Sequence, residues 1–148
     1  MTRRMQTSAA SDRGMRQEAG MAESGMTVLV ADAHPAVRAA LRFALELEGI
    51  SIRTVADIAE LETAEPLTQI DCLVLDLALS GARELDAVDR LRRAGCDTPV
   101  IFTATHPGRG VRARVERAGA SLVEKPLIGD ALVERIRGVA RRSSLAGG

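Results

Sequence analysis

Aromatic residues are almost absent from this sequence. Phe43 and Phe102 are its two phenylalanines, and tryptophan and tyrosine are missing. Proteins that bind single-stranded nucleic acid or flat cofactors usually stack them on aromatic rings, so this composition argues against both ligand classes. The core must therefore be aliphatic.

The sequence also has few cysteines, no net charge and no long apolar run. The two cysteines, Cys72 and Cys96, have neither metal-binding nor redox spacing, and Cys72 lies in an apolar run typical of a core. A formal net charge of +0 gives no electrostatic support for nucleic-acid binding. No run reaches the roughly 18 apolar residues of a membrane span, and no signal-peptide pattern is present. We therefore expect a cytoplasmic protein with neither a nucleic-acid nor a membrane partner.

Lysine occurs once. Lys125 stands among nineteen arginines and directly precedes Pro126. Its ammonium is a compact point charge, whereas an arginine guanidinium is a broad planar fork. Either chance in an arginine-rich chain or the need to fit beside a small anion explains the lysine, and the residues upstream favour the second explanation.

Apolar patterning begins at Thr27. The segment 1–25 is rich in serine, alanine, arginine, glutamine and glycine without an apolar period, so we expect a disordered tail there. One domain is expected over residues 26–141, with a flexible tail over 142–148 and no room for an effector domain.

Short apolar runs alternate with amphipathic segments along this domain. The predicted strands are Thr27–Ala31, Ile50–Val55, Cys72–Leu75, Pro99–Phe102 and Ser121–Glu124. The predicted helices run from Pro35 to a stop at Gly49 and over Asp57–Glu65, Glu84–Ala94, Gly110–Ala118 and Ile128–Arg141. This alternation predicts an α/β fold with one doubly wound, five-stranded parallel sheet in the order 2-1-3-4-5. A site is expected beyond the carboxyl ends of its strands.

Charged and hydroxyl residues fall where these strands end. Asp32 follows the first strand, Asp76 the third, the Thr103–Thr105 stretch the fourth and Lys125 the fifth. A carboxylate can accept a phosphoryl group as an acyl phosphate, provided that a divalent cation and a cationic or hydroxyl group take up the oxygen charge. Because Mg²⁺ prefers carboxylate and carbonyl oxygens, Asp32, Asp76 and a nearby backbone carbonyl are candidate ligands.

Over roughly residues 27–140 the chain resembles the receiver domains of two-component response regulators, which have a flavodoxin-like fold. The resemblance depends on three segments at the spacing typical of that family: 30–38, 71–77 and 118–126. Two-component signalling is the function that it implies.

The resemblance also implies roles for the site residues. Asp76 would be the phosphoacceptor, Lys125 would contact the phosphoryl oxygens, and Asp32, Asp76 and the backbone carbonyl of Ala78 would bind Mg²⁺. The second acid that usually follows the first strand and binds the metal directly is Ala33 here. Since the charge of the ligands sets the affinity for hard cations, we expect weak Mg²⁺ binding.

The hydroxyl position on the fourth strand is ambiguous. Counted from Pro99 it falls on Ala104, which would leave Thr103 and Thr105 on the wrong faces of the strand. Counted back from Lys125 it falls on Thr103. We favour Ala104 by strand register and keep Thr103 as an alternative contact of the phosphoryl group.

Two functions remain open. The first is a single-domain response regulator that accepts a phosphoryl group at Asp76 from a histidine kinase or a phosphotransfer protein, and the retained Asp32 and Lys125 favour it. The second is a pseudo-receiver whose partner binding is independent of phosphate, which Ala33 favours. Neither is an enzyme beyond slow self-catalysed gain and loss of phosphate. A flavin protein is disfavoured, because no aromatic residues are available to sandwich a flavin ring and no glycine-rich phosphate loop follows the first strand.

The remaining polar residues have more modest interpretations. We interpret His34 as a solvated loop residue and His106, near the mouth of the site, as a candidate modulator of water access. The arginines of Gly110–Ala118 wrap around their helix and suit a solvated face. By the resemblance, this fourth helix, the fifth strand and the last helix form the surface for a downstream protein partner or a homodimer.

Overall fold

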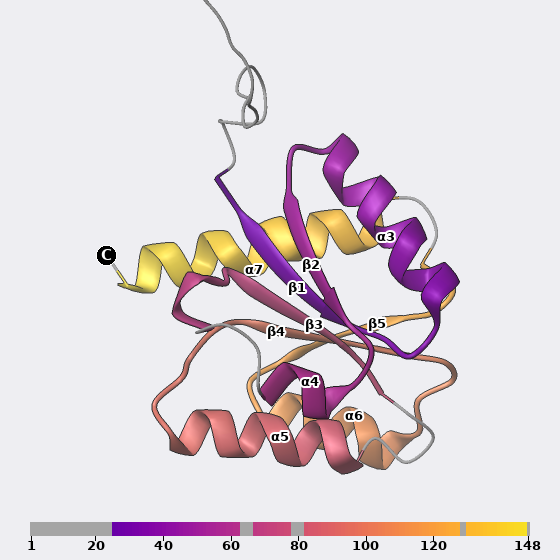
Figure 1. Cartoon of the computed structure of the whole chain (residues 1–148). Coiled ribbons are helices and arrows are strands. Elements are labelled where there is room, and N and C mark those ends of the chain that lie inside the picture. Colours follow the sequence, from indigo (N-terminus) through magenta and orange to yellow (C-terminus); the bar gives the residue numbers. More distant parts are fainter. Residues whose placement is uncertain (1–24, 63–66, 78–81, 128–129, 148) are drawn as a thin grey trace, which may run out of the picture.

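A five-stranded parallel sheet in the order β2-β1-β3-β4-β5 lies at the centre of the molecule (Figure 1). The computed structural model of the chain describes residues 25–62, 67–77, 82–127 and 130–147. The strands are β1 (Thr27–Ala31), β2 (Ser51–Val55), β3 (Cys72–Asp76), β4 (Val100–Ala104) and β5 (Ser121–Glu124). The fold class and strand order predicted from the sequence are confirmed.

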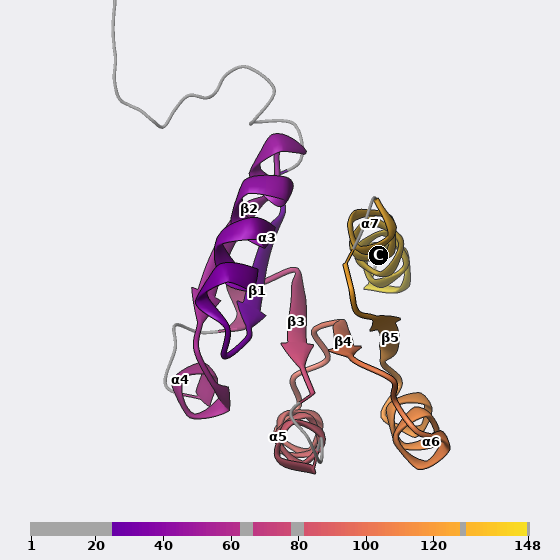
Figure 2. The same ribbon diagram turned by 90° about the vertical axis from the view of Figure 1, so that its right-hand side faces the viewer.

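Helices cover both faces of this sheet (Figure 2). They are α3 (Pro35–Leu47), α4 (Ile58–Glu62), α5 (Ala82–Arg93), α6 (Arg109–Arg117) and α7 (Ala131–Gly147), with a short 3₁₀ turn at Leu67–Gln69. In both views α3 and α7 lie on one face, and α4, α5 and α6 lie on the other. Among the described residues, no helix is long and apolar enough to cross a membrane.

Two apolar cores, aliphatic except for the fully buried Phe102, lie between the sheet and the helices. In β3, Leu73 and Leu75 face the core shared with α4, α5 and α6, whereas Val74 faces the core shared with α3 and α7. A strand buried on both faces needs an uninterrupted apolar run, which is why β1 and β3 have this composition. Burial raises the pKa of the Cys72 thiol to about 12, so this side chain behaves as a small apolar core residue.

Helix α3 starts and stops where the sequence predicts. Pro35 occupies the first turn, where its missing N–H costs nothing, and Gly49 has the positive φ of 79° that commonly ends a helix. Leu41 and Leu45 are buried, whereas Leu47 is 70% exposed. Successive helical residues are about 100° apart, so Leu47 lies roughly 200° around the helix from Leu45.

The C-terminal end differs from the expectation, and most of the N-terminal end lies outside the described residues. Helix α7 continues past Arg141 to Gly147, so the tail expected over 142–148 is helical as far as Gly147. No proline interrupts this stretch, and alanine, leucine and arginine are strong helix formers. Apart from Gly25, the tail expected over 1–25 lies outside the described residues.

Candidate functional site

Three charged side chains meet at the carboxyl edge of the sheet. Asp32 follows β1, Asp76 is the last residue of β3 and Lys125 follows β5. The Lys125 Nζ lies 2.9 Å from Asp32 Oδ2 and 2.9 Å from Asp76 Oδ1. The three side chains therefore form one small ionic cluster, which is what their positions at the strand ends predict.

Backbone hydrogen bonds fix where these side chains begin. The Lys125 N–H donates to the Ala104 carbonyl oxygen at 2.8 Å, and the Asp32 N–H donates to the Val55 carbonyl oxygen at 3.2 Å. The Arg38 guanidinium on α3 donates to the Asp32 carbonyl oxygen at 2.7 Å. Hydrogen bonds from the sheet and from the first turn of α3 therefore position the cluster.

The charges of the cluster stabilise one another despite their burial. The side chains of Asp32, Asp76 and Lys125 are 2%, 15% and 16% exposed. Burial raises the pKa of the Asp32 carboxyl, but hydrogen bonds from the His34 backbone and from Lys125 outweigh it and lower that pKa below its ordinary value. Burial lowers the pKa of Lys125, but its bonds to Asp32 and Asp76 outweigh it and raise that pKa. Two carboxylates and one ammonium leave one negative charge in excess, which favours a cation.

Thr103 belongs to the cluster, and the favoured strand register was wrong. Its hydroxyl donates to Asp76 Oδ1 at 3.1 Å, and Thr103 and Asp76 are register partners in the β3–β4 ladder. Ala104 instead packs with Phe102 in the core on the other face. The count from Pro99 ran one residue too far, because the β3–β4 ladder pairs Asp76 with Thr103 rather than with Ala104. Counting back from Lys125 gives the residue that the structure places beside Asp76.

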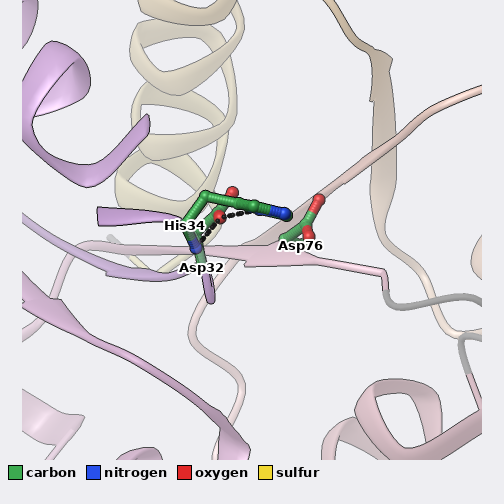
Figure 3. Close-up of side chains that lie close together, drawn as sticks. All are labelled: Asp32, His34 and Asp76. Carbon is green, nitrogen blue, oxygen red and sulfur yellow. Dashed lines mark hydrogen bonds and ion pairs between the residues drawn. The ribbon is translucent and has the colours of Figure 1, made fainter. Parts of the chain in front are cut away.

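His34 also contacts the cluster, which its interpretation as a solvated loop residue missed. Its Nδ1 lies 3.1 Å from Asp32 Oδ1, and its backbone N–H donates to the same oxygen at 2.9 Å. The imidazole is 68% exposed and points from Asp32 toward Asp76 (Figure 3). An aspartate that accepts a hydrogen bond from the N–H two residues later forms an Asx turn. The Asp-x-His spacing at a strand end was therefore the available signal.

The donor set fits a divalent cation. Asp32, His34 and Asp76 each offer one ligand atom, and these atoms lie within 4.8 Å of one another. Ala33 is exposed and offers no side-chain ligand. The carbonyl of Ala78, the remaining predicted ligand, lies outside the described residues.

Two further sequence interpretations concern the surroundings of the site. His106 is exposed, with a positive φ of 49°, in the connection that follows β4. On α6, Arg112 forms an ion pair with Glu124 of β5. Arg114 pairs with Asp86 and, at 3.6 Å, with Asp89 of α5. These two arginines thus tie α6 to its neighbours as well as facing solvent.

The sequence matches a known family and several regulators. The family described as response regulator receiver domain matches residues 28–137. The C4-dicarboxylate transport transcriptional regulatory protein DctD of Pseudomonas aeruginosa is 32% identical over 111 residues, which cover 74% of this chain and 24% of DctD. The transcriptional regulatory protein TcrA of Mycobacterium tuberculosis is 30% identical over 141 residues, which cover 95% of this chain and 55% of TcrA. The matches thus span only part of each relative.

Solved structures share the fold. The response regulator StyR superposes with a TM-score of 0.73 at 26% identity, covering 81% of this chain and 61% of StyR. A response regulator receiver protein from Burkholderia phymatum gives a TM-score of 0.63 at 31% identity, covering 78% of this chain and 94% of that protein.

Proposed function

Because the chain belongs to the receiver-domain family of two-component response regulators, we propose that it accepts a phosphoryl group at Asp76. Receiver domains interact with histidine kinases or phosphotransfer proteins, and one of these would be the donor. The observation that carries the proposal is the Lys125 ammonium, which lies 2.9 Å from a carboxylate oxygen of both Asp32 and Asp76. A compact cation held there can neutralise the charge of a transferred phosphoryl group. We expect the exchange to take place in the cytoplasm.

The residues around Asp76 have distinct tasks in this proposal. Lys125 and the Thr103 hydroxyl both donate to Asp76 Oδ1, which orients the carboxylate. The other oxygen, Oδ2, then attacks phosphorus and forms an acyl phosphate while the donor histidine leaves. Lys125 and Thr103 would next donate to the phosphoryl oxygens.

Asp32 and Asp76 would hold the cation of the site. Receiver domains bind Mg²⁺ at such an acidic cluster, and the excess negative charge described above suits it. When bound, the cation supplies Lewis-acid stabilisation of the phosphoryl oxygens. Asp32 is prepared for this role because its lowered pKa keeps the carboxylate ionised. The proposal does not make the chain an enzyme, since any loss of phosphate would be slow and self-catalysed.

Output would pass through the surface of α6, β5 and α7 to a downstream protein or to a second copy. Glu124 precedes Lys125 in the chain and pairs with Arg112 of α6. A shift of Lys125 toward a phosphoryl group would therefore pull directly on this surface. The substitution Arg117→Glu reverses an exposed charge on α6, and we expect it to weaken association without changing labelling at Asp76. Arg112→Glu is a poorer probe because it also breaks the pair with Glu124.

A docking module that works without phosphate is the second candidate function. Ala33 favours it, because the acid that usually binds the metal directly in this family is missing. A weak cation site would slow both the gain and the loss of phosphate.

Labelling with acetyl phosphate decides between the two functions. The protein is incubated with acetyl phosphate and Mg²⁺, and its intact mass is measured alongside an ordinary receiver domain. We expect the mass of one added phosphoryl group in the wild type and none in Asp76→Asn. An unlabelled wild type beside a labelled reference receiver contradicts phosphoryl acceptance and leaves the docking module.

A further inference from the structure

We propose that the cation site is a mixed imidazole and carboxylate site. In it, His34 supplies a ligand in place of the acid missing at Ala33. Such a site takes a divalent transition-metal ion in preference to Mg²⁺. This inference rests on that part of the proposed function in which Asp32 and Asp76 hold a cation, and it does not require that Asp76 be phosphorylated.

The spacing of the ligand atoms fits a shared ion. His34 Nδ1 and Asp32 Oδ1 are 3.1 Å apart. Two ligands bound to one ion at ordinary Zn–N and Zn–O lengths lie about 3.0 to 3.4 Å apart. Asp76 contributes the third atom, within 4.8 Å of the other two. The imidazole is 68% exposed, so the surrounding side chains leave it room to rotate toward a shared ion.

The two oxygens of Asp32 face different partners. Oδ2 accepts from the Lys125 ammonium at 2.9 Å, whereas Oδ1 faces His34. An ion that binds Oδ1 and the imidazole therefore leaves the Lys125 contact in place. The cation and the lysine can occupy the site together, as phosphoryl transfer to Asp76 requires.

The loop also holds the imidazole close to where a ligand is needed. The His34 N–H donates to Asp32 Oδ1 at 2.9 Å, and Pro35 fixes the backbone immediately afterwards. Arg38 donates to the Asp32 carbonyl oxygen at 2.7 Å. Little backbone freedom is left for the ion to remove, although the ring itself is exposed.

The chemistry of the donor set decides which ion is preferred. Mg²⁺ takes oxygen ligands in a strict octahedron, and an imidazole nitrogen is a poor substitute. Imidazole suits zinc, iron, nickel and copper, and affinity for a given site rises along the first-row series to copper. Replacing an acid by an imidazole therefore costs Mg²⁺ affinity and favours the transition metals.

Binding of Co²⁺ and of Mg²⁺ tests this inference directly. Titrations of the full chain without a histidine tag are followed by calorimetry, and Co²⁺ binding also by visible absorption. His34→Ala should weaken Co²⁺ binding by about tenfold or more and leave Mg²⁺ binding within about twofold. The Co²⁺ absorption bands should shift as a nitrogen ligand is lost. His106→Ala is the matched control, because it removes the other histidine, and it should change neither titration.

The reciprocal variant tests the replaced acid. Ala33→Asp restores a carboxylate next to Asp32 and should tighten Mg²⁺ binding by about tenfold. Combined with His34→Ala, it should keep this gain in Mg²⁺ affinity but bind Co²⁺ more weakly than Ala33→Asp alone.

Equal Co²⁺ affinity in the wild type and His34→Ala overturns the inference. An equal loss for Co²⁺ and Mg²⁺ overturns it too, because that result reports a damaged loop rather than a lost nitrogen ligand. These outcomes are separable from the labelling experiment. If Asp76 is labelled but Co²⁺ affinity is independent of His34, the proposed function stands and this inference is wrong. If acetyl phosphate never labels the protein but Co²⁺ affinity depends on His34, this inference stands and the proposed function is wrong.

Discussion

Lys125 stabilises the two buried carboxylates of the cluster. Asp32 is almost fully buried and Asp76 largely so, and Lys125 donates to both at 2.9 Å. A buried ion pair adds little stability over an apolar equivalent, but removing one partner strands the other charge. The lysine is therefore a structural requirement of this cluster.

Replacing this lysine should leave the buried carboxylates without their ammonium partner and so destabilise the fold. We expect Lys125→Met to lower the free energy of unfolding by about 3 kcal/mol, since the methionine keeps the packing of the stem but removes the charge. Urea unfolding followed by circular dichroism measures it, because the chain has no tryptophan for fluorescence. Arg117→Met on the exposed face of α6 should change the free energy by less than about 0.5 kcal/mol. Similar effects of the two substitutions would argue against a stabilising role for Lys125.

Helix α3 shows how a helix divides its apolar residues between core and surface. Leu45 is fully buried against the sheet, whereas Phe43 and Leu47 are largely exposed on the same helix. Exposed single apolar residues are common and cost little. The contribution of this helix to stability therefore depends on one stripe that includes Leu41 and Leu45.

A pair of matched substitutions measures that difference. Leu45→Ala should lower the free energy of unfolding by about 3 kcal/mol, because it removes buried methyl groups and leaves a cavity. Leu47→Ala deletes the same atoms from an exposed site and should change it by less than about 0.5 kcal/mol. Urea midpoints of the two variants give the comparison. A large loss in Leu47→Ala would mean that this face of α3 is covered in solution, for instance by a second copy.

The bounds of a helix or strand were predictable from the sequence where a clear sequence signal marked them. β5 lies over Ser121–Glu124 as predicted, because a short apolar run between a glycine and Lys-Pro has clear bounds. Leu45 and Leu47 are both apolar, and only the orientation of α3 on the sheet decides which one is buried. The end of α7 was missed because neither glycine nor proline follows Arg141 before Gly147, so no sequence signal marks where the helix stops.

The site was predictable where side chains follow strands and less so where turns position them. Asp32, Asp76 and Lys125 meet because parallel strands end at the same edge, which topology alone dictates. Thr103 required the register of β4, and a one-residue error reverses the face of every side chain. His34 required the folding of a turn back onto Asp32, which residue spacing only suggests.

The molecule as a whole joins distant parts of the chain through the charged cluster. The hydrogen bond between Lys125 and Asp32 spans 93 positions in the sequence and connects the end of β5 to the end of β1. The two cores lie on opposite faces of the sheet, and the cluster lies at the edge where both end. Global stability should therefore respond to the protonation of these two residues.

The dependence of stability on pH follows from the two pKa shifts. The pKa of Asp32 is lowered from its ordinary value of 3.8, so its contribution is present above that pH and is lost as the pH falls through the folded-state pKa. The pKa of Lys125 is raised from 10.5, so its contribution is present below that pH and is lost as the pH rises through the folded-state pKa. Stability should therefore decline at both extremes.

Substitution of Asp32 isolates the acid side of this profile. Free energies of unfolding are measured in urea between about pH 5 and pH 2, where a carboxylate with a lowered pKa takes up its proton. We expect Asp32→Asn to show a shallower decline than the wild type, because asparagine has no proton to gain. Asp97→Asn removes an exposed aspartate from the connection before β4 and should keep the wild-type slope. Parallel profiles for the wild type and Asp32→Asn would mean that the pairing of Asp32 with Lys125 does not govern the acid transition, and that other carboxylates do.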